Sequence, residues 1–141
     1  MLRPLLIIGT GGSGGKTIRA MKQAMKRRLE SVRYEGELPA AWQFLQIDTT
    51  RDGIDFPAPM LPDDEFYRVV KRGDDFASVL GRITSTGNET EQHSMLGGWG
   101  IPKSAITITD GAGQIRAIGR QAGMSDSKGT LDALRNAIGK M

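Results

Sequence analysis

A glycine-rich segment between an apolar run and a helical pattern constrains the fold of this chain more than any other feature. Residues 8–17 read Ile-Gly-Thr-Gly-Gly-Ser-Gly-Gly-Lys-Thr, and five of these ten are glycine. A turn with few side chains lets the backbone approach a ligand closely and direct several N–H groups at one anion. Helix N-termini attract anions as well. The segment therefore predicts a β-strand, a phosphate-binding loop and a helix in immediate succession.

The flanking residues predict a parallel α/β fold. Residues 5–9 form a short apolar run typical of a strand buried on both faces, and residues 42–47 form a second one that ends on Asp48-Thr49-Thr50. Between them, apolar residues recur at helical spacing, at Ile18, Met21, Met25, Leu29 and Val32 within an expected helix over residues 15–32. A strand–helix–strand order gives two parallel strands with a right-handed crossover, whose carboxyl ends form the usual ligand site. We therefore expect a Rossmann-like three-layer α/β domain with a mainly parallel sheet.

The second half of the chain predicts further helices separated by loops. We expect one domain over residues 1–141, with a variable insertion at about residues 51–105. A loop over 51–62 is followed by a helix that starts at Pro62-Asp63-Asp64-Glu65 and continues through Val70. The later expected elements are a short helix over 75–81, an exposed loop over 84–100, a strand at 106–109, a small-residue loop at 110–114 and helices over 115–122 and 128–138.

Composition excludes several classes of function. The chain has no cysteine and a single histidine, His93, so we predict neither a disulfide nor a metal site. No apolar run reaches the roughly 20 residues of a membrane span, and we expect a cytoplasmic protein. The net charge is +3, but aromatic residues are only 6% and none lies among the charges, which argues against a nucleic-acid partner.

Much of the positive charge falls on the first predicted helix. It carries Lys16, Arg19, Lys22, Lys26, Arg27, Arg28 and Arg33 against Glu30 alone. A solvated helix face is the simpler interpretation. The alternative is a non-enzymatic protein that binds an acidic partner through this helix.

Three nucleotide-binding motifs compete for the glycine segment. The pattern Gly9-x-Gly11-x-x-Gly14 fits the dinucleotide fingerprint, with Asp48 as a ribose-binding acid that lies farther along the chain than the usual spacing of about 20 residues. Gly15-Lys16-Thr17 ends like a Walker A loop, but Thr10 stands where that motif requires its first glycine. The third motif is the first nucleotide loop of the tubulin and FtsZ superfamily.

Three segments together resemble this superfamily. Gly9–Thr17 resembles its opening glycine loop, and Phe44–Thr50 resembles the strand and loop that follow. Gly111-Ala112-Gly113-Gln114-Ile115-Arg116-Ala117-Ile118-Gly119-Arg120 resembles its third loop and helix, especially in the bacterial tubulin-like proteins. Three motifs in the expected order are more specific than any one of them.

The resemblance implies a cytoskeletal GTPase domain that binds GTP or GDP, with Mg²⁺ as a candidate companion, and that assembles into filaments. It implies nucleotide-binding roles for Gly9, Thr10, Gly11, Gly12, Ser13, Gly14, Gly15, Lys16, Asp48, Thr49, Gly111, Ala112, Gly113 and Gln114. The glycines would offer N–H groups to the α- and β-phosphates, Asp48 and Thr49 would lie near the ribose or phosphates, and residues 112–114 would line the γ-phosphate.

The sequence departs from the superfamily in two respects. Its signature Gly-Gly-Gly-Thr-Gly-Thr-Gly loop and its acidic hydrolysis loop do not occur in these 141 residues. We therefore interpret the chain as the N-terminal portion of such a domain, with no catalytic residue of its own. Hydrolysis and polymerisation would need later segments. The alternatives are an NAD(P)-binding domain of an oxidoreductase and the partner-binding protein described above.

Overall fold

A parallel sheet of three strands forms the centre of the structure, in the order β1–β2–β3. The computed structural model describes residues 3–51, 56–71, 73–86 and 116–141. The strands are β1 (Leu5–Thr10), β2 (Trp42–Asp48) and β3 (Phe66–Arg68). The central strand β2 pairs with β1 from Leu5↔Trp42 to Thr10↔Ile47, and with β3 from Gln46↔Phe66 to Asp48↔Arg68.

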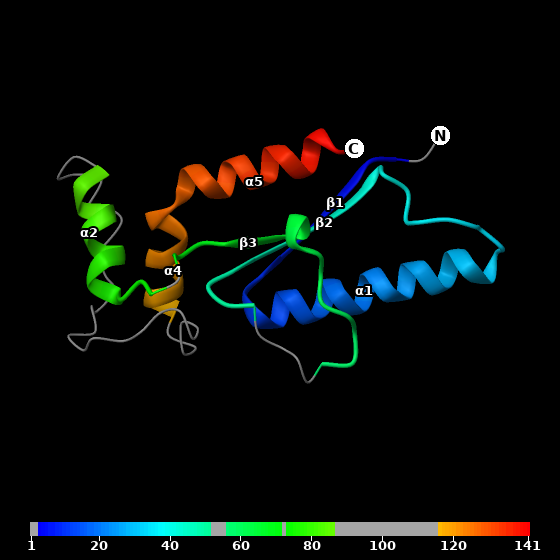
Figure 1. Ribbon diagram of the computed structural model, residues 1–141, viewed down its shortest axis with the longest axis horizontal. Helices are drawn as coiled ribbons and strands as arrows, with labels where there is room; N and C mark the ends of the chain where they lie inside the picture. Colours follow the sequence, from blue (N-terminus) through cyan, green and yellow to red (C-terminus); the bar gives the residue numbers. More distant parts are fainter. Residues whose placement is uncertain (1–2, 52–55, 72, 87–115) are drawn as a thin grey trace.

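Helices cover the two faces of this sheet. Successive side chains of a strand point to opposite faces. On β2, Phe44 packs with Ile18 of helix α1 (Gly11–Ser31), while Leu45 faces helix α5 (Ser127–Gly139). Figure 1 shows α1 and α5 on opposite sides of the strands. The three-layer parallel α/β class predicted from the sequence is therefore confirmed.

Two further helices lie beyond the carboxyl end of β3 (Figure 1). They are α2 (Phe76–Thr86) and α4 (Arg116–Ser125), and they pack against each other. The short 3-10 helix η1 (Asp63–Glu65) leads directly into β3.

The core consists of two apolar clusters at different places in the fold. Under α1, the buried members are Ile18, Phe44 and Leu61, with Ile7, Met25 and Leu38 packed against them. Beyond β3, the buried members are Val69, Val70, Val79, Ile118 and Ala122, with Ile47, Tyr67, Leu80 and Met124 around them. Ile47 contributes to the second cluster from the strand that carries Phe44, so β2 joins the two clusters.

Several predicted boundaries were wrong. Helix α1 begins at Gly11 instead of at residue 15, and α2 continues to Thr86 instead of ending at residue 81. The helix predicted over residues 62–70 is the 3-10 turn η1 followed by strand β3. Phe66, Val69 and Val70 can be read as one helix face, but pairing of residues 66–68 with β2 extends the sheet instead.

Some predicted apolar faces are only partly buried. Ile8 of β1 is 45% exposed, so this strand is not buried on both faces. Met21 on α1 is 45% exposed, and Val32, which follows the helix as its C-cap residue, is 61% exposed. On α5, Leu131 and Ile138 are exposed and the buried residue is Ala137, because the side of α5 that meets the sheet carries small residues.

The interval expected to be a variable insertion, residues 51–105, includes structural elements of the domain. It contains β3, α2 and the buried residues Leu61, Val69, Val70 and Val79. The expected strand at 106–109 and the loop at 110–114 lie outside the described residues, as does the first residue of the helix expected over 115–122.

We predict that Gly9→Ala destabilises the fold by about 1–3 kcal/mol, the usual range for overpacking. A Cβ at Gly9 would lie 2.5 Å from the carbonyl oxygen of Gly14 and 3.0 Å from Cγ2 of Ile18. Urea unfolding measures the effect. Gly81→Ala is the matched control, because it lies in open space on α2 and should stabilise by about 0.5–1 kcal/mol. Equal stability of Gly9→Ala and the wild type would contradict the packing assigned here.

Candidate functional site

The first strand joins the first helix without an intervening loop. β1 ends at Thr10 and α1 begins at Gly11. Gly11 has a φ of 67°, in the left-handed region that glycine adopts without strain, and this permits the abrupt change of direction. The glycines expected to form a loop therefore form the first turns of the helix.

This arrangement leaves backbone donors free at the helix N-terminus. The N–H groups of Gly11, Gly12 and Ser13 have no acceptor within α1, because helical hydrogen bonds run back four residues. The Thr10 side chain does not cap them, and the first turn carries no acidic residue. Among the described residues, no heavy atom lies within 4 Å of a Cβ built on Gly11 or on Gly12. With respect to this part of the chain the turn is open and uncapped, and it is suited to an anion.

Three other glycines are required by close packing. Gly9 and Gly14 face each other, and a Cβ on Gly14 would lie 2.9 Å from the Gly9 carbonyl carbon. A Cβ on Gly15 would lie 2.2 Å from Nε2 of Gln46. These contacts seat the start of α1 directly on the ends of β1 and β2.

Asp48 and Thr49 lie at the neighbouring strand end. Thr10 pairs with Ile47, so Asp48 follows at the same edge of the sheet as the glycine segment. Oδ1 of Asp48 accepts a hydrogen bond of 2.7 Å from the Thr49 N–H. Arg68 donates to the Thr49 carbonyl oxygen at 3.0 Å. Thr49 is 5% exposed, and its main chain is held on both sides.

The structure thus brings together ten of the residues named from the sequence. Eight of them lie along the β1–α1 junction: Gly9, Thr10, Gly11, Gly12, Ser13, Gly14, Gly15 and Lys16. Asp48, the last residue of β2, lies beside this junction, and Thr49 directly follows β2. Gly9 and Gly15 are buried, whereas Gly12, Ser13 and Lys16 are exposed. Gly111, Ala112, Gly113 and Gln114 lie outside the described residues.

Sequence reasoning missed two residues that shape this edge, Gln46 and Arg68. Gln46 is 4% exposed and its amide lies against Gly15. A signal for it existed, since it is the one polar residue in the run Phe44-Leu45-Gln46-Ile47 and shares a face with Phe44. Arg68 had no such signal, because its role depends on the pairing of β3 with β2.

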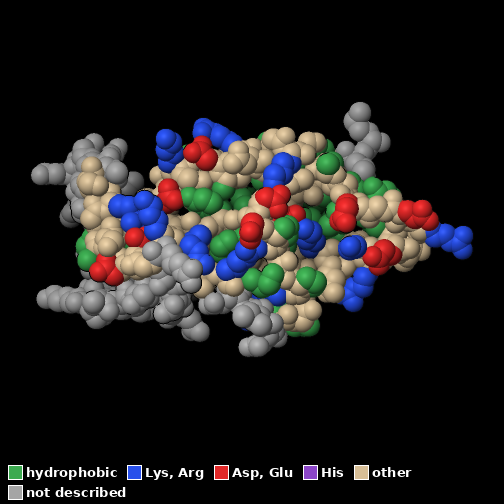
Figure 2. Space-filling model, in the orientation of Figure 1, with side chains coloured by type: hydrophobic (Ala, Val, Ile, Leu, Met, Phe, Trp, Pro, Cys, Tyr) green, Lys and Arg blue, Asp and Glu red, His purple; other side chains and the backbone are tan. Residues whose placement is uncertain are grey.

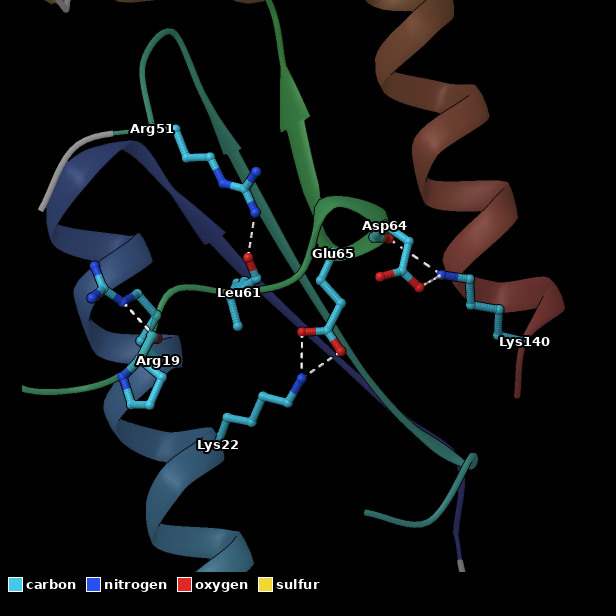
Figure 3. A network of polar contacts seen from close by, with 8 residues as sticks. Arg19, Lys22, Arg51, Leu61, Asp64, Glu65 and Lys140 are labelled. Carbon is cyan, nitrogen blue, oxygen red and sulfur yellow. Dashed lines mark hydrogen bonds and ion pairs between the residues drawn. The ribbon is translucent and has the colours of Figure 1, made fainter. Parts of the chain in front are cut away.

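Two arginines fix the connection between β2 and η1 (Figure 3). Arg19 on α1 donates to the carbonyl oxygens of Ala58 and, at 2.9 Å, of Pro59. Arg51 donates to the carbonyl oxygen of Leu61 and pairs with Asp63. Main-chain carbonyls of an irregular segment need donors when they leave water, and the two guanidinium groups supply them.

The basic helix does not present one cationic face. Arg19 is 3% exposed and donates hydrogen bonds to the carbonyl oxygens of Ala58 and Pro59. Lys22 contacts both carboxylate oxygens of Glu65 at 2.6 Å, as Figure 3 shows. Lys26, Arg27 and Arg28 are consecutive and point in different directions around the helix. Cationic and anionic side chains are intermixed on the face seen in Figure 2. The interpretation of a fully solvated face was wrong for Arg19 and Lys22.

The shifted pKa values among the described residues belong to contacts that hold elements together. A hydrogen bond from Lys140 lowers the pKa of Asp64, and one from Arg82 lowers the pKa of Asp74. Burial, followed by the hydrogen bond to Asp126, raises the pKa of Tyr67. Asp126 is the N-cap of α5 and accepts from the Gly129 N–H at 3.2 Å. The contacts of Asp126 and Lys140 hold the two ends of α5 against β3 and η1, and Arg82 holds α2 against the segment that precedes it.

The parallel sheet, with helices on both faces and a glycine-rich strand-to-helix junction at its carboxyl edge, defines a Rossmann-like type of α/β domain. A family model described as tubulin-like matches residues 6–141. The chain belongs to this tubulin-like family. Neither a comparison with curated proteins nor one with solved structures gives a match. None of the helices in the described part of the chain is both long enough and apolar enough to cross a membrane.

We predict that Arg19→Met lowers the free energy of unfolding by about 1–3 kcal/mol, because the carbonyls of Ala58 and Pro59 lose their donor. Methionine keeps the apolar stem, so the loss reports the guanidinium group. Chemical denaturation measures it, with Arg28→Met on the exposed side of the same helix as the control. That control should stay within about 0.5 kcal/mol of the wild type. Equal effects of the two variants would refute the role given to Arg19.

The contact between Asp74 and Arg82 should make the stability of the fold depend on pH. Its pKa is held below 3.8 mainly by the hydrogen bond from Arg82, so its stabilisation is complete above that value and is lost as the pH falls through the lowered pKa. Asp74→Asn should therefore be less stable at pH 7, by about 1 kcal/mol given the partial exposure of Arg82, and should lose less stability below pH 4. Urea titrations between pH 3 and pH 7 measure this. Asp132→Asn, which alters an exposed pair at 3.3 Å, should leave the profile unchanged.

Proposed function

We propose that this chain binds a guanine nucleotide at the carboxyl edge of its sheet, with the phosphates at the N-terminus of α1. The observation that carries the proposal is the open first turn, in which the N–H groups of Gly11, Gly12 and Ser13 have no acceptor within α1 and no side chain of the described residues caps them. Membership of the tubulin-like family supports a guanine base.

The residues at this edge have separate roles in the proposal. Gly11, Gly12 and Ser13 donate to phosphate oxygens. Lys16 is exposed one turn later, and long helical side chains lean towards the N-terminus, so its ammonium group adds positive charge beside Gly12. The carboxylate of Asp48 accepts hydrogen bonds, so it faces a donor or a cation on the nucleotide. Mg²⁺, which prefers oxygen ligands, is the expected companion of a triphosphate.

We assign nucleotide binding to the residues described here, and we assign neither hydrolysis nor filament assembly to them. We also propose a cytoplasmic and cytoskeletal role, and membership of the tubulin-like family supports it. The contribution expected from Gly111, Ala112, Gly113 and Gln114 stays a prediction.

A dinucleotide is the second candidate ligand. Gly14 packs on Gly9 as the third glycine of the dinucleotide fingerprint packs on its strand, and Asp48 stands at the end of the second strand. A Walker A site is disfavoured, because that motif needs an extended loop and here the helix starts directly after the strand. A purely partner-binding function loses support because Arg19 of α1 is buried and Lys22 pairs with Glu65.

A titration of the chain with fluorescent GTP, ATP and NAD analogues in the presence of Mg²⁺ tests the proposal. We expect preference for GTP. Gly12→Asp should weaken binding at least about tenfold, or about 1.4 kcal/mol, because a carboxylate at the open turn repels phosphate.

Gly139→Asp is the matched control, since it adds the same charge in open space at the far end of α5. It should bind like the wild type. Preference for NAD would show that the ligand is a dinucleotide and not a guanine nucleotide. If Gly12→Asp leaves the affinity unchanged, the phosphates do not bind at this turn.

A further inference from the structure

The buried amide of Gln46 lies between the two halves of the candidate site. Gln46 is on the central strand β2, pairs with Gly9 of β1 and with Phe66 of β3, and is 4% exposed. Its neighbour on the same face, Phe44, belongs to the apolar cluster under α1. A polar side chain therefore occupies a core-facing position directly below the start of the helix.

The amide contacts both sides of this edge. Its Nε2, Cδ and Oε1 atoms lie 2.2, 2.4 and 2.7 Å from the point where a Cβ on Gly15 would be. The same Nε2 lies 3.5 Å from Oδ2 of Asp48, whose other carboxylate oxygen accepts from the Thr49 N–H. One side chain thus touches the first turns of α1 and one oxygen of the carboxylate that follows β2.

Apolar packing alone does not require glutamine here. A methionine of similar length would fill the same space against Gly15 without the cost of burying an amide. That cost is offset when the amide hydrogen-bonds to a group that must be held in place. The Asp48 carboxylate is that group, because its other oxygen is already restrained by Thr49.

We propose that Gln46 is a positioning residue for the nucleotide site and that it acts through Asp48. Its amide fixes the orientation of the Asp48 carboxylate relative to the free N–H groups of Gly11, Gly12 and Ser13. This inference rests on the proposed nucleotide-binding function, in which Asp48 faces the ligand. Gln46 itself does not touch the nucleotide.

A double-mutant cycle with Gln46→Met and Asp48→Ala tests the proposal, with fluorescent GTP and Mg²⁺ as the probe. Gln46→Met should weaken binding about three- to tenfold, the range for one lost hydrogen bond, while the melting temperature stays at or above that of the wild type. In the Asp48→Ala background, where the acceptor for the Gln46 amide is gone, the same change should have no further effect, because residues that act as a unit are not additive. Gln43→Met is the matched control from the same strand, since Gln43 bonds to the Ala40 carbonyl oxygen instead.

Additive effects in the cycle, or a lowered melting temperature with equal loss in both backgrounds, would make Gln46 a packing residue only and overturn the proposal. A ligand-free measurement separates this failure from that of the proposed function. In NMR spectra, Asp48→Asn should move the side-chain amide signals of Gln46 and leave those of Gln43 in place. Unmoved Gln46 signals would overturn the coupling to Asp48. If Asp48→Asn moves the Gln46 amide signals but the wild-type chain binds no nucleotide, the proposed function is refuted instead.

Discussion

The close approach of α1 to the sheet is the constraint on which the rest of the structure depends. Gly9 and Gly14 meet backbone to backbone, and the Gln46 side chain lies where Gly15 would carry a Cβ. A side chain at any of these glycines would push the helix away from the strands. Because the helix is seated so tightly, its free N–H groups lie at the same edge as Asp48, and Ile18 reaches the apolar cluster around Phe44. Packing and the candidate ligand site therefore share one cause.

Polar contacts hold the less regular parts against this seated helix. Arg19 and Arg51 donate to main-chain carbonyls between β2 and η1, and Lys22 pairs with Glu65 (Figure 3). Buried or half-buried charges persist in proteins only when such partners are present. Two of the cations that suggest an acidic partner, Arg19 and Lys22, thus make contacts within the fold. The cations of α1 that stay exposed are spread around the helix, which leaves the glycine junction as the main candidate site.

The order of strand and helix at the glycine junction could be predicted because its signals are local. A short apolar run, a cluster of glycines and a helical period define the β1–α1 junction without reference to any distant residue. The apolar run that contains Phe44, Leu45 and Ile47 likewise predicts β2, and parallel strands bring Asp48 to the junction. The failures have non-local causes. Residues 66–68 became a strand because β2 offered an unpaired edge, and the predicted apolar faces of α1 and α5 were only partly covered by the elements available to them.

The sequence by itself determined the parallel α/β class, the order of the first elements and the residues at the strand-to-helix junction, because glycine content and apolar spacing act over a few neighbouring positions. Only the tertiary structure decided which glycines serve packing and which lie in open space. It also decided that Arg19 is a buried donor and that Gln46 lies between Gly15 and Asp48. Each of these depends on contacts between residues far apart in the chain, and their geometry exists only once the helix rests on the sheet.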